Sequence, residues 1–102
     1  NQLSPEYSDM ERYFQKEVSQ KMQRLASYEK QEVVRPDLAQ LDKMMEELKR
    51  ELVNAPKGTE EQILNNLINS YQTKLAILER VLERVELTTP TEQKNEDNDL
   101  SI

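Results

Sequence analysis

Apolar side chains between Asn69 and Leu87 recur at intervals of four, three, four and three residues. The five residues concerned, called the seam below, are Tyr71, Leu75, Leu78, Leu82 and Val85. This spacing places them along one side of an α-helix and is typical of helices that lie along other helices. The sequence leaves open whether the seam faces the chain's own helices, a second copy or a different protein.

The rest of the composition also favours helices over strands. The chain has 102 residues, a single glycine and no cysteine. Glu, Lys, Gln and Leu, which are good helix formers, are abundant, whereas an all-β fold would need many tight turns. At this length the chain holds one domain at most, which predicts a single all-α domain.

Two prolines mark the starts of the first two predicted helices. Ser4 is a good N-cap and Pro5 suits the first helical position, which predicts a helix over residues 5–29. Pro36 disfavours helical conformation at the residue before it and can itself open a helix, so a second helix is expected over residues 36–53. The apolar positions expected to face the core are Tyr7, Met10, Phe14, Val18, Met22 and Leu25, then Leu38, Leu41, Met45, Leu48 and Leu52.

The segment "NAPKGTEEQ" is the strongest turn signal in the chain. Pro56 prevents a helix from continuing, Gly58 lets the chain reverse, and Thr59 with Gln62 forms a capping-box pattern. A third helix is therefore expected over residues 60–86. Beside the seam it carries a second apolar stripe at Ile63, Leu67, Ile77 and Val81. Such a wide face favours packing against two helices at once over a two-stranded coiled coil, and it predicts that this helix is the centre of the core.

Short connections predict that consecutive helices run antiparallel. The expected fold is a three-helix, antiparallel, up-down-up bundle over residues 1–87, followed by a disordered acidic tail over residues 88–102. The second helix is expected to be shorter than the others, which would leave apolar surface uncovered. That surface is the first indication of a contact with another chain. Self-association as a homodimer stays open.

Catalytic, metal and cofactor chemistry find little support in the sequence. The chain has neither His nor Cys, so the usual zinc ligands and nucleophile constellations are excluded, and one glycine cannot build a phosphate-binding loop. The glutamates at positions 79, 83 and 86 and at positions 46, 47 and 51 are interpreted as solvated helix faces. We therefore expect no catalytic residue, no metal site, no cofactor and no enzyme activity.

Charge and side-chain type also bear on the class of partner. The formal net charge is −6 with both signs mixed along the chain, which gives no electrostatic footprint for nucleic acid or anionic lipid. The aromatic side chains are interpreted as core residues rather than as the lining of a binding pocket. Three of the four methionines fall on the core stripes, whereas Met44 lies beside its stripe and is a candidate for a surface patch.

Three segments carry a resemblance to a known family. They are "LSPEYSDMERYFQKEVSQKM", "DLAQLDKMMEELKRELVNA" and "EEQILNNLINSYQTKLAILERVLERVE". From Leu3 to about Glu86 the chain resembles the C-terminal soluble region of small Bacteroidetes membrane proteins that are described as anti-sigma factors or left uncharacterised. The most telling pieces are Ser4-Pro5-Glu6 and "INSYQTKLAILERVL".

The resemblance implies a membrane-anchored regulator. A short cytoplasmic segment and a single transmembrane helix would precede Asn1, and this domain would face the periplasm as a non-enzymatic protein-interaction domain in signalling. A sigma factor would be contacted only through that upstream segment, and the membrane only through the upstream span. The alternative is a soluble cytoplasmic, homo-oligomeric structural or adaptor module.

Overall fold

The computed structural model describes residues 5–88, and this part of the chain is helical without any strand. Its three helices are α1 (Pro5–Ser27), α2 (Gln31–Val53) and α3 (Glu60–Thr88). The all-α prediction is confirmed. The third helix runs two residues further than expected, to Thr88. The predicted acidic tail otherwise lies outside the described residues.

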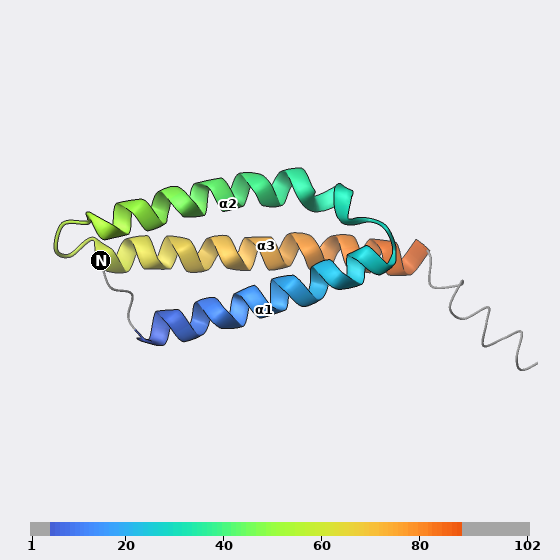
Figure 1. Cartoon of the computed structure of the whole chain (residues 1–102), viewed down its shortest axis with the longest axis horizontal. Coiled ribbons are helices and arrows are strands. Elements are labelled where there is room, and N and C mark those ends of the chain that lie inside the picture. The colour runs from blue at the N-terminus through green and yellow to red at the C-terminus, as the bar shows by residue number, and fades with distance from the viewer. Residues whose placement is uncertain (1–4, 89–102) are drawn as a thin grey trace, which may run out of the picture.

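The helices form an up-down-up arrangement with α3 in the centre. Figure 1 shows α3 between α1 and α2, with α2 running antiparallel to both. Each outer helix contacts α3 extensively, whereas α1 and α2 contact each other little. In the same view α1 is inclined to α3, and the two helices diverge toward the N-terminal end of α1. The prediction that the third helix is the centre of the core is therefore correct.

The core consists of two clusters that draw on all three helices. The aromatic cluster contains Tyr7, Phe14, Met45, Leu52, Leu67 and Tyr71. The aliphatic cluster contains Leu25, Val34, Leu38, Leu78, Leu82 and Val85. Most of these residues were expected to be core residues from helical periodicity. Three positions differ. Met10 is 38% exposed, and Leu41, which was expected to face the core, is only partly buried and belongs to neither cluster. Val34, which the sequence did not mark, is 1% exposed.

The start of the second helix was predicted wrongly. Helix α2 begins at Gln31, not at Pro36, so α2 is as long as α1 rather than shorter. Pro36 is the sixth residue of α2, where it removes one backbone hydrogen bond, and Figure 1 shows α2 bent near its N-terminal end. The first turn is retained because it places Val34 in the aliphatic cluster, and burying a valine side chain contributes ~1.5–3 kcal/mol.

The connection between α1 and α2 has only three residues, from Tyr28 to Lys30. The Lys30 amide donates to the Leu25 carbonyl (3.0 Å), and the Glu29 amide donates to the Ala26 carbonyl (2.9 Å). These two bonds are those of a Schellman motif, in which the residue after the helix adopts a left-handed conformation. Glu29 holds this position with φ of 58°, although glycine is the residue usually found there.

The connection between α2 and α3 follows the sequence signals more closely. Gly58 has φ of 94°, in the left-handed region, as expected for the residue that reverses the chain. The Thr59 hydroxyl donates to the Pro56 carbonyl (2.7 Å), an interaction different from the expected capping box with Gln62. Helix α3 begins directly afterwards, with the Ile63 amide donating to the Thr59 carbonyl (3.2 Å).

Candidate functional site

The seam faces the other helices of the same chain. Tyr71, Leu78, Leu82 and Val85 are all buried, and Leu75 is partly buried against the aromatic cluster. Tyr71 belongs to the aromatic cluster, whereas the three residues at positions 78, 82 and 85 belong to the aliphatic cluster. The seam residues are therefore core positions, and a surface that binds another molecule has to be sought elsewhere.

A polar network adjoins the aromatic cluster at Tyr71 and links all three helices. The Tyr71 hydroxyl on α3 donates to Glu11 Oε2 on α1 (2.9 Å), and Lys49 Nζ on α2 lies 2.5 Å from the same oxygen. The Glu11 side chain is only 16% exposed. Gln15 Nε2 lies 3.5 Å from the Tyr71 hydroxyl oxygen, at the limit of a hydrogen bond. Glu11 thus joins a tyrosine and a lysine that are 22 residues apart in the sequence. The periodicity of a single helix could not reveal that these three side chains meet.

The Tyr71 ring contacts another aromatic ring and a lysine ammonium group. It stacks on Phe14, with the ring centroids 5.4 Å apart and the planes inclined by 3°, and Lys74 Nζ lies 5.8 Å from its centroid. Burial raises the pKa of Tyr71 far above its usual value, and the hydrogen bond to Glu11 adds to this effect. The hydroxyl therefore stays protonated at neutral pH and acts as a hydrogen-bond donor. This arrangement links side chains of all three helices.

Lys74 is a buried cation between the two core clusters. Its side chain is 11% exposed, and Nζ lies 2.6 Å from Asp42 Oδ1 on α2. Lys74 lies on the core-facing side of α3, three residues after Tyr71 and four before Leu78, and the sequence pattern did not single it out. The ion pair offsets the cost of burying the Lys74 ammonium group. Asp42 is 55% exposed and reaches the ammonium group from the rim of the core.

Two of the glutamates interpreted as solvated contact another helix. Lys21 Nζ on α1 lies 3.6 Å from Glu79 Oε2, and Arg24 on α1 pairs with Glu86. These ion pairs run along the contact between α1 and α3. Within residues 5–88 no three acidic side chains come together in a way that could hold a metal ion.

The side of α2 and α3 that faces away from α1 carries an elongated groove. Two adjoining pockets form it, since both are lined by Leu41, Met44 and Thr73. The wall on α2 presents the apolar side chains of Leu41, Met44 and Leu48, and beside them it carries four polar or charged residues, Asp37, Gln40, Lys43 and Glu47. The wall on α3 is mostly polar, with Asn66, Asn69, Ser70, Thr73 and Ile77. We call the three apolar residues of the α2 wall and these five residues of the α3 wall the outer groove. Met44 is 46% exposed there, in agreement with its interpretation as part of a surface patch.

Neither a membrane-spanning helix nor a related protein accompanies this site in the described residues and the comparisons. Among residues 5–88, no helix has an apolar stretch long enough to cross a membrane. No protein-family model matches the sequence, and no significant match was found among curated proteins or among solved structures.

Proposed function

We propose that this chain is a non-enzymatic protein-interaction domain whose outer groove binds one amphipathic helix of a partner protein. The observation that carries the proposal is the shape and chemistry of the groove. Two neighbouring helices form a channel along which a third helix can lie, and helix-in-groove binding is a common mode of recognition. Met44, with its flexible thioether side chain, is suited to adapting to such a partner.

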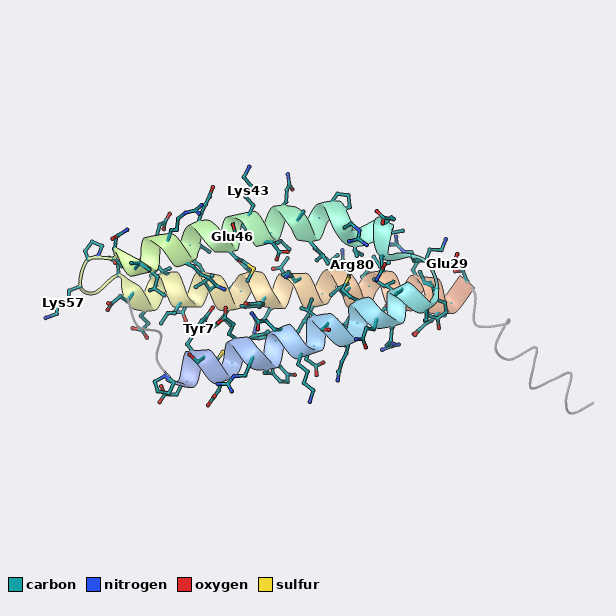
Figure 2. The ribbon with its side chains drawn as sticks, viewed as in Figure 1. Tyr7, Glu29, Lys43, Glu46, Lys57 and Arg80 are labelled. Atoms are coloured by element: carbon teal, nitrogen blue, oxygen red, sulfur yellow. The ribbon has the colours of Figure 1, made fainter. Side chains whose placement is uncertain are left out.

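The two walls of the groove indicate the chemistry of the partner. The apolar side chains of Leu41, Met44 and Leu48 on α2 fit a stripe of apolar side chains spaced three and four residues apart. The amide and hydroxyl groups of Asn69 and Thr73 on α3 fit polar side chains at the edge of that stripe. Asp37, Lys43 and Glu47 line the rim with mixed charge, so a partner helix of balanced charge fits better than a strongly basic or acidic one. Figure 2 shows the Lys43 side chain extending from α2 away from α3.

As part of the same proposal, the domain belongs to the periplasmic side of a membrane-anchored regulator that resembles anti-sigma factors. The support for this context is the resemblance of the three helical segments. It requires an apolar stretch of ~20 residues directly upstream of Asn1 in the complete coding sequence. A coding sequence without that stretch would contradict the anchored form and leave the interaction domain itself untouched.

Site-specific photocrosslinking in cells tests the groove. A benzoyl-phenylalanine residue is placed at position 44 or, as control, at position 23, where the exposed Gln23 lies on α1. We expect a crosslinked protein from position 44 only, with the crosslink mapping to an amphipathic helix of that protein. Equal crosslinking from both positions, or a crosslink to a segment without an apolar stripe, would contradict the proposal.

Two substitutions complete the test. Met44→Glu introduces a charge into the groove, and we expect it to abolish the crosslink formed by a second probe at Asn69. Met10→Glu is the matched control, because Met10 is also a partly exposed methionine but lies on α1. Both variants should keep the helical content of the parent chain. Loss of the crosslink in the Met10→Glu variant as well would indicate a general effect of the added charge.

A further inference from the structure

The turn between α1 and α2 combines two features that oppose each other. Its three residues, Tyr28, Glu29 and Lys30, include neither glycine nor proline and are compatible with a continuous helix. Nevertheless, Glu29 is held in the left-handed region with φ of 58°. A residue with a Cβ atom adopts this conformation at a cost of about 1 kcal/mol. Figure 2 shows Glu29 at this turn, at the end of the molecule opposite Lys57.

The contacts of α1 determine what straightening this turn would disrupt. Helix α1 contacts α3 much more than it contacts α2, to which it is joined by the ion pair of Glu11 with Lys49. The interactions that hold α1 are therefore mainly those with α3, such as the stack of Phe14 on Tyr71 and the ion pair of Lys21 with Glu79. A rearrangement that moves α1 onto α2 and α3 of another copy preserves these interactions, including the ion pair of Glu11 with Lys49.

We propose that residues 28–30 form a hinge through which two copies of this chain exchange α1, giving a domain-swapped dimer. In the dimer, residues 5–53 form one helix of roughly 70 Å. The α1 segment of each copy packs on α3 of the other copy, so the same side-chain contacts form between chains. Pro36 does not oppose this helix, because α2 already contains it.

The balance between the two forms follows from the hinge and from mass action. The dimer releases the left-handed conformation of Glu29 in both chains and adds helical hydrogen bonds across residues 28–30. The monomer avoids the entropic cost of association. The dimer fraction therefore rises with protein concentration, and short hinges under strain favour such exchange. This inference is independent of the outer groove, which lies on the side of α3 away from α1.

Two substitutions at one position test the hinge. Glu29→Gly relieves the left-handed conformation and weakens a continuous helix, whereas Glu29→Ala keeps a Cβ atom and favours the helix. Both variants are refolded from denaturant over roughly a hundredfold range of concentration, and their mass is measured by light scattering. We expect the dimer dissociation constant of Glu29→Gly to exceed that of Glu29→Ala by about 10²–10³-fold, since each dimer contains two hinges. Equal dissociation constants, or two variants that stay monomeric throughout, would overturn the proposal.

Chemical crosslinking distinguishes α1 exchange from other forms of dimer. The chain has no cysteine, so Lys21→Cys and Glu79→Cys can be combined and joined by a short bis-maleimide. The monomer should give only crosslinks within one chain, and the isolated dimer should give covalent dimers. A dimer that gives only crosslinks within one chain overturns the exchange. Met44→Glu should leave the dimer fraction unchanged, so failure of the groove proposal and failure of the hinge proposal give different results.

Discussion

The hydrogen bond between Tyr71 and Glu11 offers a direct test of how the three helices are held together. Tyr71→Phe removes only the hydroxyl group and keeps the ring, so the stack on Phe14 is preserved. The hydroxyl donates to Glu11 Oε2 over 2.9 Å, and Lys49 Nζ, which lies 2.5 Å from the same oxygen, is left unchanged by the substitution. The substitution therefore removes the hydrogen bond to Glu11 together with the long contact to Gln15 Nε2 at 3.5 Å.

The expected magnitude follows from the partners of Glu11. A hydrogen bond to a charged group contributes ~1.5–3 kcal/mol to stability. The Glu11 side chain is 16% exposed and keeps Lys49 as a partner, so water and the ammonium group offset part of the loss. We expect the free energy of unfolding to fall by ~1–2 kcal/mol. Tyr13→Phe is the matched control, because the same hydroxyl is removed from a ring that is 57% exposed. Its effect should stay within about 0.5 kcal/mol.

Urea unfolding followed by far-UV circular dichroism measures these changes. Combining Tyr71→Phe with Glu11→Ala closes a double-mutant cycle, for which we expect a coupling energy of about 1 kcal/mol. If Tyr71→Phe costs no more than Tyr13→Phe, or if the coupling energy is zero within error, the network does not stabilise the fold. The helices would then be positioned by apolar packing alone.

Three further predictions concern the core and its charges. Leu78→Ala should lower the free energy of unfolding by ~2–5 kcal/mol, because Leu78 is 0% exposed, whereas Leu87→Ala at a 73% exposed position should change little in the same urea titration. Lys74→Met should be nearly neutral or stabilising, since Asp42 is 55% exposed and can be hydrated once its partner is lost; a decrease above ~3 kcal/mol would contradict this reasoning. Burial raises the pKa of Tyr7 from 10.0 to about 12. The folded state therefore holds this proton more tightly than the unfolded state, and stability that is complete below pH 10 should decrease as the pH approaches 12, which thermal unfolding at a series of alkaline pH values measures.

Local signals explain which parts of this fold could be predicted. The spacing of Leu78 and its neighbours along the seam acts within one helix, and Pro56 and Gly58 act within one turn. They identified three helices, the central position of the third and most buried positions. The same signals failed at Pro36, because a proline near a helix start is read as a boundary. Burial of Val34, which depends on residues of another helix, retains the turn before it.

The polar contacts depended on the tertiary structure. Glu11, Tyr71 and Lys49 lie on three different helices, and nothing in the spacing of one helix reveals that their side chains meet. Lys74 illustrates the same limitation, since a charged residue is assigned to the surface until a partner such as Asp42 is found across the helix contact.

The sequence by itself determined that this chain forms three helices, because helical periodicity and chain breakers act over a few residues. Only the tertiary structure decided that the seam is buried within the chain, that Glu29 adopts a left-handed conformation and that the outer groove stays open. These features depend on which helix faces which, and that choice is made by packing and charge pairing between residues far apart in the chain.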